Sequence, residues 1–86
     1  MSVSIQYFAW LREKTGIDQE TVELPEDVKT IDNLFTWLGS RGEEFHSIIE
    51  NAEIIQVALD KKHQMDKSTE LGDTTEIALF PPMTGG

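Results

Sequence analysis

Polar and hydrophobic residues alternate along several short stretches of the chain, and this alternation predicts β-strands. The first stretch covers residues 3–10, where β-branched and aromatic residues dominate. Residues 20–24 form a second stretch, which we expect to pair with the first as a hairpin. Two further stretches cover residues 54–60 and 76–80. Between them, the polar segment 61–67 predicts a hairpin that contains a short edge strand.

A different spacing predicts one main helix. Ile31, Leu34, Phe35 and Leu38 recur at intervals of three or four residues, so they share one side of a helix. Thr30 precedes them and is a suitable N-cap, because its hydroxyl can accept a hydrogen bond from an early helical N–H. The other expected features are a helix end at Gly39 or Gly42, a helical turn at 11–16, a short helix at 43–49 and a turn at 71–74.

The main predicted elements follow in the order β-β-α-β-β, with one main helix across a mixed sheet. This order describes an α+β roll. A length of 86 residues is enough for one domain with a modest core. We therefore expect a folded domain at residues 1–80, followed by an extended C-terminal tail at residues 81–86.

The predicted strands carry apolar residues on both faces, although a sheet with a helix on one side only should present a polar outer face. The expected inward residues are Val3, Ile5, Tyr7, Ala9, Ile55, Val57, Leu59, Ile77 and Leu79. The outward positions then hold Ile54 and five residues that we predict to contact a partner, namely Phe8, Trp10, Ala58, Ala78 and Phe80. An exposed apolar patch is typical of protein interfaces. The alternative is that the second helix or a loop covers some of these residues.

Charge excludes some classes of partner. Seven basic and sixteen acidic residues give a net charge of −9, which should repel nucleic acids and anionic lipids. The acidic surface either keeps the protein soluble or steers it toward a basic partner. Cysteine is absent, so disulfides, thiolate metal sites and cysteine nucleophiles are excluded. The chain shows neither a signal-like N-terminus nor an apolar run of about 20 residues, so a soluble, cytoplasmic protein is expected.

Conventional catalytic motifs are scarce. His46 and His63 are isolated and lack the spacing of metal ligands, so surface or capping roles are expected for both. No phosphate-binding loop or dinucleotide motif is present. Acidic residues crowd the second strand and its turn, where solvated charge is the default; they are Asp18, Glu20, Glu26 and Asp27. Nothing in the sequence indicates an enzyme that acts alone.

The C-terminal sequence is the main functional signal, and it consists of Pro81, Pro82, Met83, Thr84, Gly85 and Gly86. Prolines favour extended geometry, and two glycines without Cβ atoms can pass along a narrow channel. The tail can reach about 20 Å when extended. We therefore expect the carboxylate of Gly86 to be the reactive group. Adenylation would activate that carboxylate, and sulfide could then displace AMP to leave a thiocarboxylate.

The segment from Ile77 to Gly86 (IALFPPMTGG) resembles the C-terminus of the molybdopterin synthase small-subunit family, a family of ubiquitin-like sulfur carriers. The motif Tyr7-Phe8-Ala9-x-Leu11-Arg12-Glu13-x-x-Gly16 resembles the first strand and turn of the same family. The resemblance implies a β-grasp fold, on which Phe8 and Phe80 match positions that contact partners.

The resemblance also implies a reaction sequence at Gly86. A ubiquitin-activating-type enzyme would adenylate the Gly86 carboxylate with ATP and magnesium, and a sulfur donor would convert it to a thiocarboxylate. The tail would then enter the large synthase subunit and supply sulfur to cyclic pyranopterin monophosphate. In such complexes the large subunit dimerises and each copy binds one carrier, which makes a heterotetramer.

Other functions use the same kind of tail. The chain could carry sulfur for thiamine synthesis or tRNA thiolation, although the double proline and Phe80 favour the molybdopterin pathway. A protein modifier that forms isopeptide bonds to lysines is a third reading. A plain interaction module is a fourth, and it leaves Gly85 and Gly86 unexplained.

Overall fold

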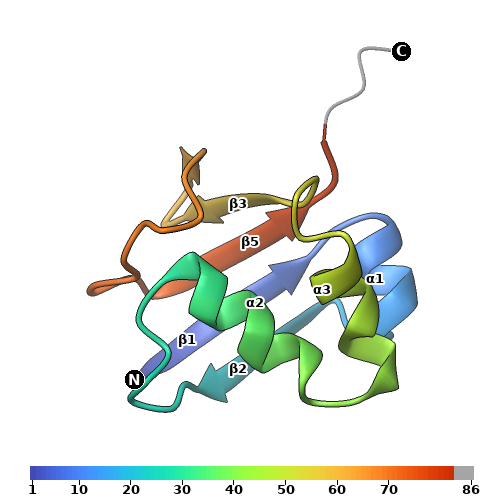
Figure 1. The fold of residues 1–86 in the computed structure, drawn as a ribbon, viewed down its shortest axis with the longest axis horizontal. Coiled ribbons are helices and arrows are strands. Elements are labelled where there is room, and N and C mark those ends of the chain that lie inside the picture. The colour runs from blue at the N-terminus through green and yellow to red at the C-terminus, as the bar shows by residue number, and fades with distance from the viewer. Residues whose placement is uncertain (83–86) are drawn as a thin grey trace.

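Strands β1 (Ser2–Tyr7) and β5 (Glu76–Phe80) run parallel to each other in the middle of one sheet. The computed structural model describes residues 1–82 of the chain. Antiparallel strands flank the central pair, and they are β2 (Gln19–Glu23), β3 (Gln56–Leu59) and β4 (Lys62–Gln64). The resulting five-stranded order is β2-β1-β5-β3-β4, which confirms the predicted mixed sheet (Figure 1).

The helices cover one face of this sheet, as Figure 1 shows. Helix α2 (Ile31–Gly39) lies across the strands, and α1 (Trp10–Thr15) and α3 (His46–Glu50) lie near one end. A 3₁₀ turn, η1 (Glu43–Phe45), leads into α3. The core between the two layers contains the four predicted apolar residues of α2. It also contains every residue predicted to point inward from the sheet, except Ala9. Among residues 1–82, no helix is long and apolar enough to cross a membrane.

Helix α2 begins where the sequence predicts. The hydroxyl of Thr30 accepts a hydrogen bond from the Asn33 N–H at 3.1 Å. In return, the side-chain oxygen of Asn33 accepts from the Thr30 N–H at 3.2 Å. This reciprocal capping box satisfies two backbone donors that a helix start leaves without partners. The helix ends at Gly39, the first of the two predicted end points.

Asp60 connects the β3–β4 hairpin to the start of β5. Both residues of the turn, Asp60 and Lys61, have positive φ angles of 48° and 71°. The Asp60 carboxylate accepts hydrogen bonds from the backbone N–H groups of Thr75 at 3.1 Å and Glu76 at 2.9 Å. These backbone donors stabilise the charged form and hold the pKa of the Asp60 carboxyl below its usual range.

The first strand is shorter than predicted, and Ala9 is the reason. Ala9 has φ 54° and ψ −128°, which is outside the β region. The chain therefore leaves the sheet after Phe8, and α1 begins at Trp10. The prediction that Ala9 points inward is wrong, since Ala9 is exposed. The left-handed Gly16 (φ 76°) ends α1, as the sequence predicts.

Two other boundaries also differ from the prediction. Strand β3 begins at Gln56, because the chain between Asn51 and Ile54 forms hydrogen-bonded turns. Ile54 is exposed, but it lies in this turn rather than on the sheet. The single short helix predicted at residues 43–49 is η1 followed by α3. Periodicity alone does not distinguish one short α-helix from a 3₁₀ turn that is followed by a shorter α-helix.

Candidate functional site

The outer face of the sheet, opposite the helices, is polar along β1 and β2 and at the start of β5, and apolar toward the carboxyl end of β5. Its polar part comprises Ser2, Ser4, Gln6, Gln19, Thr21, Glu23 and Glu76. Its apolar part lies toward the carboxyl end of β5, where the chain leaves the sheet. We call this part the outer apolar surface, and it consists of Phe8, Ala58, Ala78, Phe80, Pro81 and Pro82.

The strand register explains why these residues come together. Tyr7 is paired with Leu79, and the Phe8 N–H donates to the Leu79 carbonyl at 3.1 Å. Phe8 therefore lies level with Phe80, one residue beyond the paired Tyr7 and Leu79. On the other side of β5, Ala58 is paired with Ala78. Since alternate residues of a strand point to opposite faces, Ala58, Ala78 and Phe80 all lie on the outer face.

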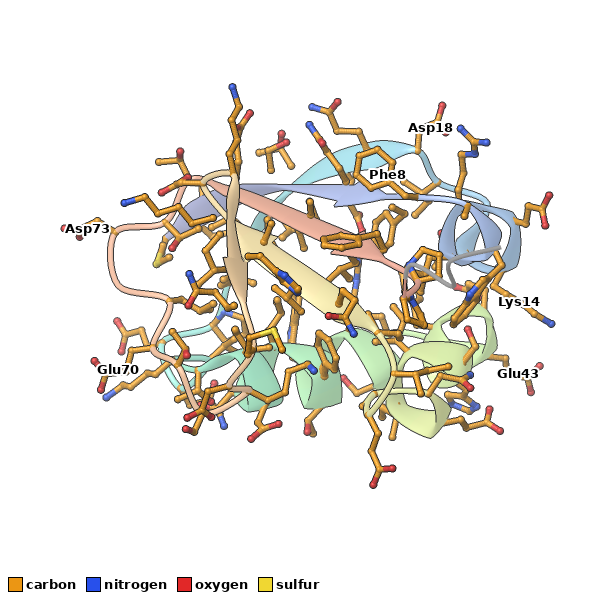
Figure 2. All side chains as sticks on the ribbon, turned by 90° about the horizontal axis from the view of Figure 1, so that it is seen from above. Phe8, Lys14, Asp18, Glu43, Glu70 and Asp73 are labelled. Atoms are coloured by element: carbon orange, nitrogen blue, oxygen red, sulfur yellow. The ribbon has the colours of Figure 1, made fainter. Side chains whose placement is uncertain are left out.

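Five of these residues line an open hollow of about 450 Å³, and they are Phe8, Ala78, Phe80, Pro81 and Pro82. Phe8 is 45% exposed, an unusual fraction for a large aromatic side chain without a partner. Figure 2 shows Phe8 projecting from the side of the sheet opposite the helices, with Asp18 on the same side. The hollow combines exposed aromatic surface with the point at which the C-terminal segment leaves the fold.

Phe8 also borders a smaller polar hollow of about 180 Å³ on the side away from Phe80. Arg12 and Asp18 lie there, with Arg12 Nε 3.4 Å from an Asp18 carboxylate oxygen. Both side chains are mostly exposed, so this ion pair contributes little to stability. The exposed ring of Phe8 thus separates an apolar hollow from a charged one.

His63, which the sequence leaves isolated, lies at the other border of the outer apolar surface. It is paired with Ala58 across the β3–β4 ladder. Its ring lies 5.6 Å from the ring of Phe80, measured between centroids, at an interplanar angle of 52°. Its Nε2 atom is 2.8 Å from the side-chain oxygen of Gln56. His63 is exposed, as expected, but its position next to Phe80 was not predicted.

On the helix side, Tyr7 is anchored by a charged pair. Its hydroxyl donates to Glu20 at 2.7 Å, and the same carboxylate receives both Nη groups of Arg41. The Arg41 hydrogen bonds lower the pKa of Glu20. Burial and the hydrogen bond to Glu20 raise the pKa of Tyr7, so its hydroxyl stays protonated. The expectation of a solvated Glu20 is wrong, because its side chain is only 16% exposed.

The structure places four of the five predicted contact residues on the outer face, and Trp10 is the exception. Trp10 is half-buried at the start of α1 and packs against the core. The expectation that Trp10 points outward from the sheet is wrong, because it extended the first strand through Ala9. Within the tail, Pro81 and Pro82 line the hollow. Met83, Thr84, Gly85 and Gly86 lie outside the described residues.

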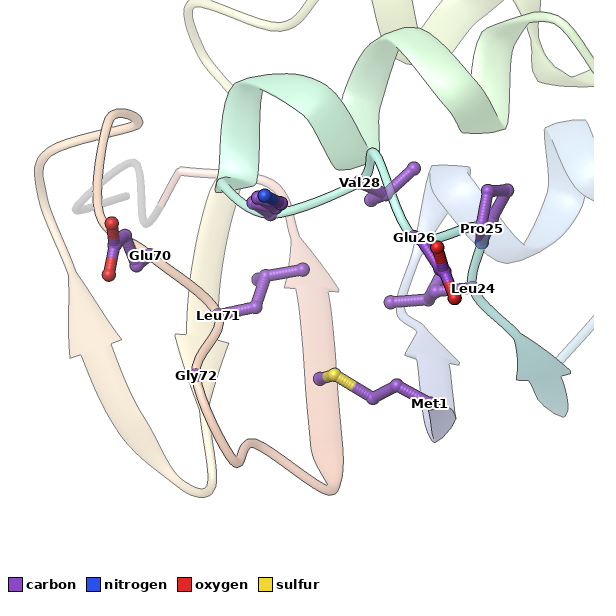
Figure 3. Close-up of a pocket in the computed structure, with 9 residues that line it drawn as sticks. Met1, Leu24, Pro25, Glu26, Val28, Glu70, Leu71 and Gly72 are labelled. Atoms are coloured by element: carbon purple, nitrogen blue, oxygen red, sulfur yellow. The ribbon is translucent and has the colours of Figure 1, made fainter.

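A third hollow, of about 340 Å³, lies at the opposite end of the sheet, where β1 and β5 begin (Figure 3). Leu24, Val28 and Leu71 form its apolar floor. Its rim carries Glu26, Lys29 and Glu70. Within residues 1–82, His, Asp and Glu side chains nowhere gather in a group of three that could hold a metal ion.

Comparison with known families gives a match that covers nearly the whole chain. The ThiS family matches residues 5–86. Several relatives bear the name molybdopterin synthase sulfur carrier subunit. The one from Haemophilus influenzae is 27% identical over 84 residues, which cover 98% of this chain and 99% of the relative. The one from Homo sapiens is 30% identical over 84 residues, which cover 98% of this chain and 93% of the relative.

Solved structures agree with this match. A putative molybdopterin converting factor subunit 1 from Pyrococcus furiosus has a TM-score of 0.72 and 27% identity, covering 96% of this chain and 99% of its own. SAMP1 from Haloferax volcanii, a small archaeal modifier protein, has a TM-score of 0.67 at 24% identity over both full chains. A chain of the complex of subunits 1 and 2 of the Helicobacter pylori molybdopterin-converting factor has a TM-score of 0.65 and 20% identity, again over both full chains. These matches confirm the ubiquitin-like β-grasp fold.

Proposed function

Since the chain belongs to the ThiS family of small sulfur carriers, we propose that it is the sulfur-carrier subunit of a molybdopterin synthase. The observation that carries this proposal is the extent of the match. Family and relatives align along almost the entire chain, and the family match includes Gly85 and Gly86. The relatives with this name also match in length, so the proposal concerns the whole chain.

The proposed chemistry takes place at the carboxylate of Gly86. An adenylating partner transfers AMP from ATP, with magnesium, to this carboxylate and releases pyrophosphate. A sulfur donor then displaces AMP and leaves a thiocarboxylate at Gly86. In the synthase, the thiocarboxylate sulfur bonds to a carbon of cyclic pyranopterin monophosphate, and water then cleaves the bond between that sulfur and the Gly86 carbonyl, so that Gly86 returns to a carboxylate. The carrier needs no catalytic side chain for these steps, because each partner supplies its own active site.

The outer apolar surface gives the folded domain a role in this proposal. It lies directly beside the end of β5, so a partner docked on Phe8 and Phe80 receives the tail next to its contact surface. Aromatic residues are enriched at the energetically important centres of interfaces. The large synthase subunit is the proposed partner, and a dimeric large subunit with two carriers would give a heterotetramer. The complex of subunits 1 and 2 from Helicobacter pylori supports this choice.

A protein modifier is the second candidate, because the chain also has the fold of SAMP1. In that case the adenylated Gly86 would form an isopeptide bond to a lysine instead of a thiocarboxylate. A carrier for thiamine synthesis or tRNA thiolation would form the same thiocarboxylate but give it to another acceptor. The two groups of candidates therefore differ in the product at Gly86, and the carriers differ from one another in the acceptor.

Intact mass spectrometry tests the proposal directly. The chain is incubated with its adenylating enzyme, ATP, magnesium and a sulfur donor, and we expect a species in which one oxygen is replaced by sulfur. That species, mixed with the large subunit and cyclic pyranopterin monophosphate, should form molybdopterin. A chain without Gly86 should fold normally and remain a carboxylate.

Each other result identifies a different function. A thiocarboxylate that forms but never reaches cyclic pyranopterin monophosphate would assign the chain to another sulfur pathway. Conjugates to lysine with no thiocarboxylate would favour the modifier. Sulfur transfer by the chain that lacks Gly86 would overturn the role of the tail.

A further inference from the structure

Strand β2 is one of the two edge strands of the sheet, and it is the one without protection against pairing (Figure 1). The other edge strand, β4, has three residues and begins with Lys62 directly after Lys61, and short strands and lysines are common means of blocking an edge. Strand β2 has five residues without lysine or proline, and its register with β1 is continuous. The unpaired backbone groups of such an edge are a template for another strand.

The hydrogen bonds of β2 define which of its backbone groups face away from β1. The Tyr7 N–H donates to the carbonyl of Asp18, the residue directly before β2, at 2.8 Å. In an antiparallel ladder, alternate residues direct both of their backbone groups toward the same neighbour. The backbone N–H and C=O groups of Gln19, Thr21 and Glu23 therefore face outward, and all three residues are exposed. None of these outward groups has a hydrogen-bond partner within residues 1–82.

A second copy of β2 fits this edge when the two strands run antiparallel about Thr21. This register places Thr21 opposite Thr21 of the other copy and Gln19 opposite Glu23, so that every outward backbone group is paired. Glu20 then lies opposite Val22, and no two like charges face each other, which would be destabilising. A register centred on Glu20 would set two glutamates opposite each other, and one centred on Val22 would leave Gln19 unpaired.

The two glutamates of β2 add little repulsion to this contact, because each already has a cationic partner. The N-terminal ammonium lies 2.6 Å from the Glu23 carboxylate, and Arg41 holds both carboxylate oxygens of Glu20. The Gln19 amide donates to Ser4 at 3.1 Å and has a second hydrogen for Glu23 of the other copy. The net charge of −9 on each copy still opposes association, and salt screens this repulsion.

We propose that β2 is a self-association surface, through which two copies of this chain join their sheets edge to edge about a two-fold axis. Opposed residues of paired strands point to the same face, so both helix layers lie on one side and both outer apolar surfaces on the other. The outer apolar surface stays free, because none of its residues belongs to β2. The contact is small and consists mainly of main-chain hydrogen bonds, so the dimer is weak and reversible. This inference is independent of the proposed function, since it uses only β2 and its neighbours.

Sedimentation equilibrium at protein concentrations from about 10 μM to about 1 mM tests the inference. We expect monomers at the lower concentration and a growing dimer fraction at the higher one, with a dissociation constant of about 10⁻⁴ to 10⁻³ M. Association should strengthen severalfold between about 0.05 M and about 0.5 M NaCl, because salt screens the repulsion between two acidic copies. Amide NMR shifts that depend on concentration should be confined to β2 and its immediate neighbours. A chain that stays monomeric at about 1 mM in both salt concentrations would overturn the inference.

Two substitutions at Thr21 separate self-association from folding. Thr21→Pro removes the outward N–H at the centre of the contact but none of the bonds to β1, so it should fold and stay monomeric. Thr21→Lys should weaken association about fivefold, since it sets two lysines opposite each other. Thr36→Lys is the matched control, because it makes the same change of side chain and net charge at an exposed position of α2. It should associate at least as well as wild type.

Circular dichroism checks that each variant is folded. If Thr21→Pro does not fold, the comparison of Thr21→Lys with Thr36→Lys decides, and equal association of these two variants would overturn the inference. Association that survives Thr21→Pro but is lost in Phe80→Asp would also overturn it, because the copies would then meet through the outer apolar surface.

Discussion

Arg41 holds both carboxylate oxygens of Glu20, with Nη1 2.7 Å from Oε2 and Nη2 3.0 Å from Oε1. The guanidinium also lies 5.2 Å from the ring centre of Trp37 and 4.6 Å from that of Phe45. This geometry joins the loop after α2 to the edge strand β2, and through Glu20 it reaches the Tyr7 hydroxyl. Planar, two-pronged pairing of this kind is specific to arginine.

Replacing Arg41 should therefore destabilise the fold. We expect Arg41→Ala to lower the free energy of unfolding by about 1–3 kcal/mol, because the Glu20 carboxylate, which also accepts from Tyr7, loses its paired charge. Arg41→Lys should restore only part of this, since an ammonium cannot pair with both oxygens in the same way. Urea denaturation measures the change. Lys14→Ala is the control, because Lys14 is exposed and has no ion pair among residues 1–82; equal effects of the two alanine variants would contradict the prediction.

The same contact predicts a response to acid. The pKa of Glu20 is lower in the folded chain than in the unfolded one, chiefly because of its hydrogen bonds to Arg41. Its stabilising contribution is therefore complete above the unfolded pKa of about 4.3 and is lost as the pH falls through the folded value. Glu20→Gln should be clearly less stable than wild type at pH 7, and this difference should shrink at pH 3.

Thermal or urea unfolding at the two pH values measures that difference. Glu13→Gln is a suitable reference, because Glu13 is exposed in α1 and its side chain makes no hydrogen bond within the described residues. A gap between Glu20→Gln and wild type that stays constant or widens in acid would show that the charge of Glu20 is not the source of the stabilisation.

Ala9 should respond to substitution in an unusual way. Its φ of 54° and ψ of −128° suit glycine better than alanine, and such a conformation costs about 1–3 kcal/mol. Ala9→Gly should therefore raise the free energy of unfolding by about 1 kcal/mol, whereas Ala9→Val should lower it by about 2 kcal/mol. Ala58→Gly in the regular strand β3 is the opposite case and should destabilise the chain. Destabilisation by both glycine variants would refute the argument from strain.

The outer apolar surface predicts the effect of two substitutions on partner binding. Phe8→Ala should weaken binding of the large subunit about tenfold or more, because an exposed aromatic ring at the centre of an interface contributes strongly. Phe80→Asp should weaken it further by placing a charge in the apolar hollow. Titration calorimetry gives the affinities, and circular dichroism shows whether the fold is kept.

Met65 provides a control of similar character at another place. It is 81% exposed and does not line the hollow, so Met65→Ala should bind like wild type. If Phe8→Ala binds as well as Met65→Ala does, the surface has no role in docking. If Phe80→Asp unfolds instead, Phe80 belongs to the core.

Local sequence patterns predicted most of the helices and strands, because residues that are close together in the chain determine where these elements begin and end. The alternation in residues 76–80 gave β5 with its correct bounds, and Thr30 marked the start of α2. The prediction of a strand over residues 3–10 was wrong from Ala9 onward. Ala9 has unusual backbone angles, and an alanine in the sequence gives no indication of them. The position of His63 could have been found, since a two-residue turn at Asp60 and Lys61 places it opposite Ala58.

The sequence by itself determined the order of the main elements and the inward residues apart from Ala9. Both depend on residues that are close together in the chain. Only the tertiary structure decided that Phe8 lies beside Phe80, that His63 borders the same surface and that Arg41 binds Glu20. Each of these pairs joins residues far apart in sequence, and their meeting depends on strand register and on the packing of the α2–η1 loop.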